Sequence, residues 1–134
     1  MVENLDKGRY YKYMFLIAAI YNWIAGILFL ILTTFFLPIA ASMFEMEVPP
    51  SLQFAHSFFV LVIIFGIGFY LVSVNIDKNH GIALMGVIEK YLVVLIYISY
   101  MAIGEAGIAG LPIIIGDFIF GCLFLEFLIN HKKL

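Results

Sequence analysis

The sequence predicts an all-α fold: a four-helix transmembrane bundle with both termini on the cytoplasmic side. Of its 134 residues, 65% are hydrophobic and only 12% are charged, whereas a soluble domain carries about 25% charged residues. The apolar residues form four long runs separated by short polar segments. The basic residues gather in segments that such a bundle places on one side. We therefore expect one domain, residues 1–134, embedded in lipid.

The first span is expected over residues 13–37, a run without any charged residue. A helix of about 20 apolar residues is long enough to cross a hydrocarbon core of about 30 Å. Pro38 is expected to end this helix, because proline cannot donate the next backbone hydrogen bond. The apolar run exceeds the roughly 7 to 15 residues of a signal-peptide core. We therefore expect a retained span followed by a loop that contains Glu45 and Glu47.

Three further spans are expected over residues 54–74, 82–103 and 112–130. The polar segment 75–81 is a short turn of the kind that joins antiparallel helices. Glycines separate the third run from the fourth, and Pro112 suits the first turn of the last helix. In lipid each span must satisfy its own backbone hydrogen bonds, so runs of this length are read as helices.

The distribution of Lys and Arg predicts the orientation of the bundle. Translocated short loops avoid basic residues. Six of the seven basic residues fall in the segments before the first span, between the second and third, and after the fourth: Lys7, Arg9, Lys12, Lys78, Lys132 and Lys133. The two other loops carry Glu45, Glu47 and Glu105 and no basic residue. This asymmetry predicts cytoplasmic termini in a prokaryotic plasma membrane.

Five polar residues are expected inside the bilayer: Asn22, Glu89, Lys90, Asp117 and Glu126. Ionisable groups at this depth are costly unless paired, so they are candidate functional residues. Counting along the helices places Asn22 and Lys90 at roughly 12 to 14 Å from the cytoplasmic boundary. Glu126 comes at roughly 6 Å and Asp117 at roughly 20 Å. These residues form a structural cluster that fixes helix register, a substrate or proton path, or contacts with a partner subunit.

Lys90 is expected to pair with Glu126. Helical side chains lean toward the helix N-terminus, which for the third span is the cytoplasmic side, the side of Glu126. Asp117 is expected nearer the outer leaflet. Glu89 and Lys90 are neighbours, and neighbours on a helix point about 100° apart. We therefore expect one of the two to face a subunit interface or the membrane surface.

Small residues on the same helix faces predict close helix packing, because membrane helices approach closely where small side chains recur. The residues expected at these contacts are Ala18, Gly26, Gly66, Gly86 and Gly121. Gly66 falls near the level of Lys90 and is expected to leave room beside it. Tyr10, Tyr11 and Tyr13 are expected in an aromatic belt at the membrane surface.

Several kinds of chemistry find no support in the sequence. The single cysteine, Cys122, excludes a disulfide within the chain. We expect no metal and no cofactor, because His56 lies away from His80 and His131 in the predicted topology, and no further ligand completes a site with the latter two. No serine has a plausible His and Asp arrangement, so no catalytic residue is assigned. No basic block indicates nucleic acid.

Three segments look familiar together: residues 15–26, residues 66–70 with 79–82, and residues 116–120. The pattern resembles small bacterial four-span membrane proteins, loosely the DoxX-like proteins. The resemblance implies the four-span fold and Asn22, Lys90 and Asp117 as residues of interest, but it implies no reaction. Those proteins usually have a Gly-Lys pair in the third span, whereas this chain has Glu89 before Lys90.

Two hypotheses for the function follow. The first is a non-enzymatic membrane component, either an accessory or scaffold subunit of a larger complex or a small homo-oligomer. The alternative is a small proton-coupled carrier that uses Lys90 and a carboxylate partner. The first span lacks the acidic residue that small four-span multidrug exporters carry there. An enzyme acting on lipid or quinone has no supporting residue set.

Overall fold

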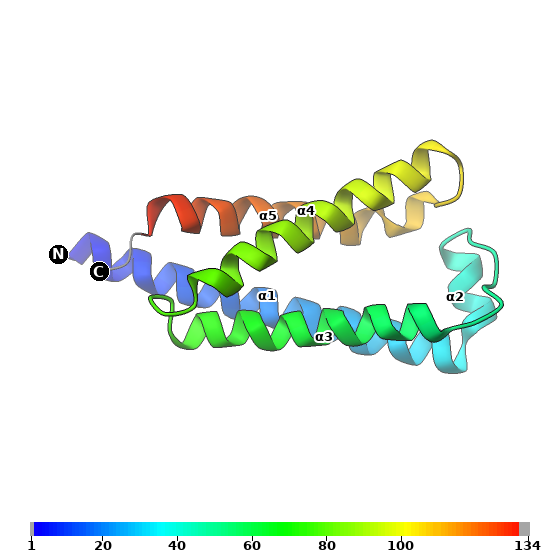
Figure 1. Ribbon diagram of the computed structural model, residues 1–134, viewed down its shortest axis with the longest axis horizontal. Coiled ribbons are helices and arrows are strands. Elements are labelled where there is room, and N and C mark those ends of the chain that lie inside the picture. Colours follow the sequence, from blue (N-terminus) through cyan, green and yellow to red (C-terminus); the bar gives the residue numbers. More distant parts are fainter. Residues whose placement is uncertain (1, 132–134) are drawn as a thin grey trace.

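The computed structural model describes residues 2–131, with side chains from residue 6 onward. Within this range the chain is helical and has no strand. The helices are α1 (Val2–Phe35), α2 (Leu37–Met43), α3 (Gln53–Val74), α4 (His80–Ala102), the short 3-10 helix η1 (Ile108–Gly110) and α5 (Leu111–Asn130) (Figure 1). The predicted all-α four-helix bundle is confirmed.

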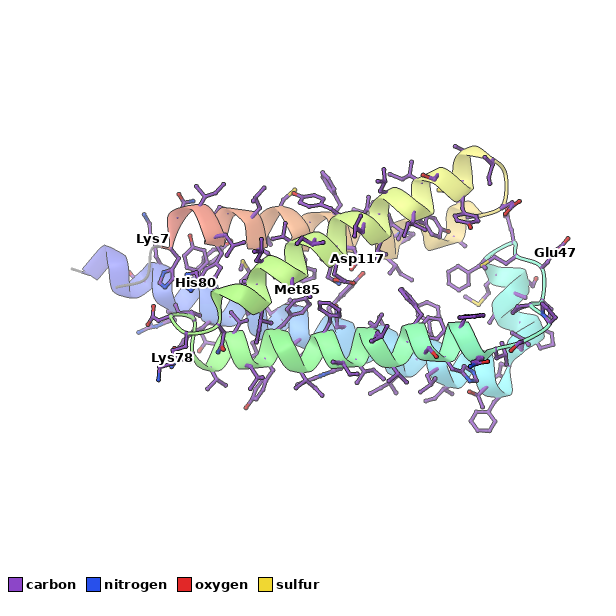
Figure 2. All side chains as sticks on the ribbon, in the orientation of Figure 1. Lys7, Glu47, Lys78, His80, Met85 and Asp117 are labelled. Carbon is purple, nitrogen blue, oxygen red and sulfur yellow. The ribbon has the colours of Figure 1, made fainter. Side chains whose placement is uncertain are left out.

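Four helical segments of the described chain are long and apolar enough to cross a membrane: Asp6–Phe35, Gln53–Val74, His80–Ala102 and Ile108–Asn130. The length and composition of these helices are those of a multi-pass membrane protein. α1 begins and α5 ends at the same end of the bundle (Figure 1). Lys7 and Lys78 lie at that end and Glu47 at the other (Figure 2). Lys132 and Lys133 lie outside the described residues.

The boundaries of the first span differ from the prediction. α1 begins at Val2 rather than near residue 13, because the polar segment before the apolar run contains no proline, and its single glycine, Gly8, is tolerated within a helix. The helix ends at Phe35, and part of the expected loop forms the short helix α2. Pro38 lies in the first turn of α2, where its missing N–H group leaves no helical hydrogen bond unmade.

The bundle consists of two helical hairpins. α1 packs along α3, and α4 packs along α5. The hairpins meet near the α3–α4 loop and diverge toward the end that carries α2 (Figure 1). An aromatic core joins them at the converging end, where Phe15 of α1 stacks on Phe124 of α5 at 4.6 Å between ring centroids. Phe69 of α3 lies 4.8 Å from Phe124, and all three rings are fully buried.

Glycines permit the close approach of α1 and α3. A Cβ atom added at Gly26 would lie 2.6 Å from Ile63 Cγ1 and 3.1 Å from the carbonyl oxygen of Phe59. A Cβ atom at Gly66 would lie 2.6 Å from the ring of Trp23. The space beside Gly66 is therefore filled by the Trp23 ring of α1. The expectation that Gly66 leaves room beside Lys90 is wrong.

The other small residues lie at contacts between helices. Ala18 is fully buried in the core. A Cβ atom at Gly86 would lie 2.5 Å from the Phe69 ring, and one at Gly121 would lie 3.3 Å from Lys90 Cβ. Gly86 thus lets the two hairpins meet at the aromatic core, and Gly121 lets α5 approach α4 beside Lys90.

Gly26→Ala is expected to lower the free energy of unfolding by about 1 to 3 kcal/mol, the usual cost of overpacking. The added methyl group would meet the backbone of α3, which cannot move aside like a flexible side chain. Gly81→Ala is the matched control, because a Cβ atom there has no neighbour within 4 Å. Denaturation in mixed detergent micelles measures both variants. An equal effect of the two substitutions would contradict the close α1–α3 contact.

Candidate functional site

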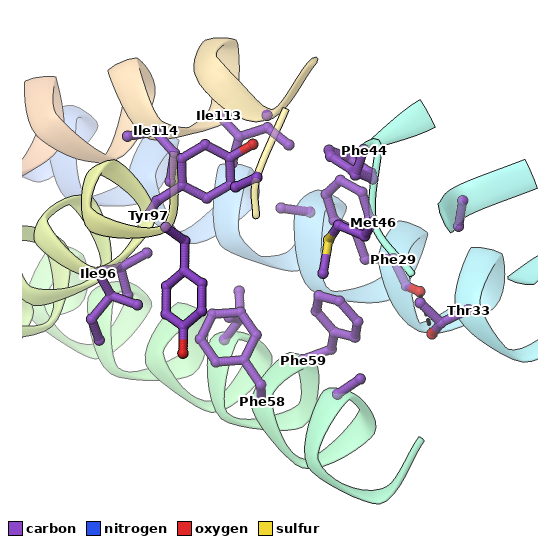
Figure 3. A pocket seen from close by; sticks show the side chains of 18 of the residues that line it. Phe29, Thr33, Phe44, Met46, Phe58, Phe59, Ile96, Tyr97, Ile113 and Ile114 are labelled. Carbon is purple, nitrogen blue, oxygen red and sulfur yellow. Dashed lines mark hydrogen bonds between the residues drawn. The ribbon is translucent and has the colours of Figure 1, made fainter. Parts of the chain in front are cut away.

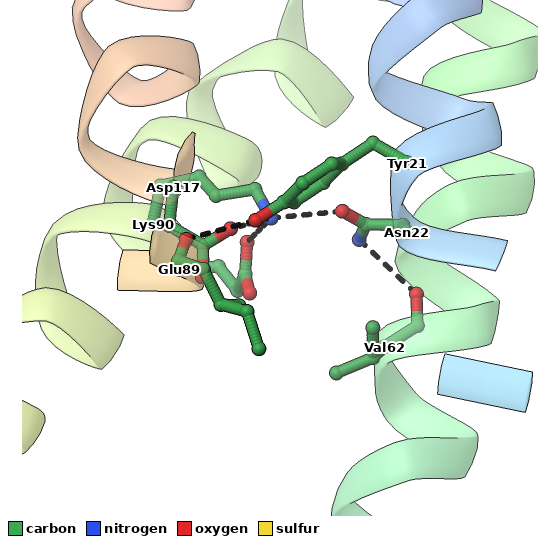
Figure 4. Close-up of polar contacts among 7 residues, drawn as sticks. Tyr21, Asn22, Val62, Glu89, Lys90 and Asp117 are labelled. Carbon is green, nitrogen blue, oxygen red and sulfur yellow. Dashed lines mark hydrogen bonds and ion pairs between the residues drawn. The ribbon is translucent and has the colours of Figure 1, made fainter. Parts of the chain in front are cut away.

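A buried lysine stands at the centre of the bundle and connects three helices. The Lys90 side chain on α4 is only 2% exposed. Its ammonium group donates a hydrogen bond to Asp117 Oδ1 on α5 at 2.6 Å and another to Asn22 Oδ1 on α1 at 2.8 Å (Figure 4). The Lys90 side chain thus links the α4–α5 hairpin to the α1–α3 hairpin through its hydrogen bonds to Asp117 and Asn22.

The expected pairing of Lys90 with Glu126 is wrong, and the helix geometry gives the reason. Lys90 leaves α4 beside Gly121 of α5. Asp117 lies four residues from Gly121, about 40° away around the helix, whereas Glu126 lies five residues away in the other direction, about 140° around it. Asp117 therefore shares the face that Lys90 meets. The expectation for Glu126 rested on its depth in the membrane, and depth does not determine which face of α5 a residue occupies.

Glu126 instead binds residues near the end of the bundle that carries Lys7. Its Oε1 accepts hydrogen bonds from the Tyr11 hydroxyl at 2.8 Å and from the Asn130 amide at 2.9 Å. Tyr11 is 3% exposed and packs edge-on against Phe127. Of the expected aromatic belt, Tyr11 thus belongs to the core, whereas Tyr10 and Tyr13 are exposed.

Glu89 lies beside Lys90, contrary to the expectation that one of the two faces away. Glu89 Oε2 is 3.5 Å from the Lys90 ammonium, and the Glu89 side chain is 14% exposed. The two Cα–Cβ bonds do point in different directions, but the three rotatable bonds of glutamate let its carboxylate return toward the lysine. Asn22, Glu89, Lys90 and Asp117 are hereafter called the Lys90 cluster.

Two further hydrogen bonds hold the cluster in place. The Asn22 amide donates to the carbonyl oxygen of Val62 on α3 at 3.1 Å. The Tyr21 hydroxyl donates to the carbonyl oxygen of Ile113 on α5 at 2.8 Å. The Lys90 ammonium lies 5.7 Å from the centroid of the Tyr21 ring, a distance at which a cation is attracted to an aromatic face. The asparagine and the lysine are therefore fixed by all four long helices.

A cavity of about 510 Å³ extends from the Lys90 cluster toward α2, between the diverging hairpins. All four members of the cluster line it. The rest of its wall is mainly apolar and aromatic, as Figure 3 shows for side chains that include Phe29, Phe44, Phe58, Phe59 and Tyr97. The sequence does not predict this cavity, because the cavity depends on how far the hairpins separate and no local motif specifies that angle.

Comparison with known proteins gives no match to a family model, to a curated protein or to a solved structure. The resemblance to DoxX-like proteins therefore stays a prediction. The proposed function therefore rests on the geometry of the described residues.

The α2 segment lies at the far end of the cavity and contacts the α4–α5 loop. Gly107 N–H donates a hydrogen bond to the carbonyl oxygen of Phe44 at 3.3 Å. The Tyr97 hydroxyl donates to the carbonyl oxygen of Gly107 at 2.6 Å. Glu47 and Glu105 line the cavity at this end. The cavity thus has a charged cluster at its floor and carboxylates at the end near α2.

His80 and His131 meet at the opposite end of the bundle, as the topology permits. Their rings stack at 5.6 Å between centroids. His80 Nε2 lies 2.9 Å from the carbonyl oxygen of His131, and His131 Nε2 lies 2.8 Å from Asp77 Oδ1. Among the residues that the structure describes, no group of three or more His, Cys, Asp or Glu side chains is arranged to hold a metal ion. His56 lies apart, 3.3 Å from the Thr34 hydroxyl.

Asp117→Asn is expected to lower the free energy of unfolding by about 3 to 5 kcal/mol, the cost of removing one partner of a buried ion pair. Glu126→Gln is the matched control. Its amide oxygen still accepts from Tyr11, so we expect a loss below about 1 kcal/mol. Unfolding in mixed micelles measures both variants. A larger loss of unfolding free energy in Glu126→Gln than in Asp117→Asn would support the pairing of Lys90 with Glu126 instead.

Proposed function

We propose that this chain is a non-enzymatic integral membrane protein that binds a hydrophobic molecule between its two helical hairpins. The cavity is the observation that supports this proposal. Small-molecule sites have volumes of about 300 to 1,000 Å³ and mainly apolar walls with a few placed polar groups. The volume of about 510 Å³, the aromatic walls and the Lys90 cluster at one end match that description.

The charge pattern supports a location for the site within the membrane. If the termini are cytoplasmic, as the basic residues predict, the cavity occupies the outer half of a prokaryotic plasma membrane. A hydrophobic ligand would then enter from the outer leaflet or past the α2 segment. The polar end of that ligand would rest at the floor, where Asp117 and Glu89 offer carboxylate oxygens.

A second candidate function is a structural one. The hydrogen bonds from Lys90 to Asn22 and Asp117 join three helices, as they would in a scaffold or accessory subunit whose cluster only fixes helix register. Such a protein would act as a homo-oligomer or within a larger complex. A proton-coupled carrier using Lys90 and Asp117 would add release on the other side to the same binding step.

Photolabelling with tritiated adamantane diazirine, a small neutral probe, tests the binding function in lipid nanodiscs. We expect labelling of cavity residues such as Phe59 and Tyr97, and excess adamantane should suppress it. Val93→Trp fills the cavity that Val93 lines. It should weaken binding of the probe about tenfold or more, which corresponds to about 1.4 kcal/mol of binding free energy, and the labelling should fall with it.

The neighbouring substitution Leu92→Trp is the matched control, because Leu92 is 51% exposed on the outer surface of α4 and does not line the cavity. It should leave the labelling of Phe59 and Tyr97 unchanged. Labelling confined to lipid-facing residues, or cavity labelling that excess adamantane does not suppress, would refute the binding function and favour the structural one.

A further inference from the structure

We propose that the molecule bound in this cavity is a lipophilic cation and that Glu89 supplies the carboxylate that neutralises its charge. This inference rests on the proposed binding function and specifies its ligand. The occupant would be an organic cation with one positive charge and an apolar, partly aromatic body. Three features of the cavity support that choice.

The first feature is the sign of the charged residues. Four carboxylates line the cavity: Glu47 and Glu105 at the end near α2, and Glu89 and Asp117 at the floor. Among the described residues of this wall, Lys90 is the only basic one. A cleft with one dominant charge and low-dielectric walls concentrates ions of the opposite sign. The cavity therefore attracts cations and repels anions.

The second feature is the hydrogen bonding at the floor. The ammonium group of Lys90 already donates to Asn22 and Asp117. Glu89 Oε2 is buried and has no hydrogen-bond partner among the described residues; its 3.5 Å separation from the ammonium exceeds an ordinary hydrogen bond. One ammonium group is thus shared by two carboxylates, so a second positive group would compensate Glu89 at membrane depth. An anionic ligand would meet two carboxylates beside Lys90.

The third feature is the composition of the wall. Aromatic side chains line the cavity between the floor and the end near α2, among them Phe29, Phe59 and Tyr97 (Figure 3). Aromatic faces attract organic cations, and the attraction increases when water is excluded. Small hydrated cations would gain little here, because the apolar wall offers few oxygen ligands. The site thus suits a cation whose charge is covered by apolar groups.

The test uses two ions of matched size and shape and opposite charge. Binding of tritiated tetraphenylphosphonium is measured in phosphatidylcholine nanodiscs, with empty nanodiscs subtracted. We expect saturable binding that unlabelled tetraphenylphosphonium displaces. Tetraphenylborate, measured in separate samples because it precipitates the cation, should show no saturable binding. Glu89→Gln should weaken binding about tenfold or more. Glu126→Gln, which alters a carboxylate outside the cavity, should leave the affinity unchanged.

Adamantane labelling of the same samples separates the two proposals. If cavity labelling is intact in the wild-type chain and tetraphenylphosphonium does not bind, the cation inference fails and the binding function stands. If both probes fail to bind saturably, the binding function itself fails. Equal affinity of the wild-type chain and of Glu89→Gln, with cavity labelling preserved in both, would overturn the role assigned to Glu89.

Discussion

The pairing of the Lys90 ammonium is the constraint on which the arrangement of this bundle depends. A charged side chain at membrane depth is costly unless other groups compensate it. Lys90 finds its partners on two other helices, Asp117 on α5 and Asn22 on α1. Asn22 in turn donates to α3 through Val62. Satisfying one buried charge therefore fixes the relative positions of four helices.

The same cluster borders the cavity of the bundle. Each hairpin is held closely by small residues, such as Gly26 between α1 and α3 and Gly121 between α4 and α5. Between the hairpins, direct packing is concentrated at the aromatic core around Phe15 and Phe124. The Lys90 cluster lies beyond this core, and past it the hairpins diverge toward α2 (Figure 1). A group that stabilises the fold thus also forms the floor of the cavity.

The sequence predicted the four helices because long apolar runs bounded by polar segments specify spans almost by themselves. It also singled out every residue of the Lys90 cluster, because strongly polar side chains at membrane depth are rare. The partner of Lys90 was not predictable from depth, since Asp117 and Glu126 lie on different faces of α5. The sequence does not predict helix α2, because Pro38 can follow the end of one helix as well as occupy the first turn of the next. The cavity depends on the angle between hairpins, which no single residue encodes.

Dipolar recoupling between the Lys90 ¹⁵Nζ and the Asp117 ¹³Cγ, measured by solid-state NMR in lipid bilayers, tests the central claim most directly. A direct hydrogen bond with a separation of 2.6 Å between Nζ and Oδ1 predicts strong coupling, which should vanish in Lys90→Met. Coupling of the Lys90 nitrogen to the Glu126 carboxylate carbon, with none to Asp117, would contradict the claim, and with it the assignment of this cluster to the cavity floor.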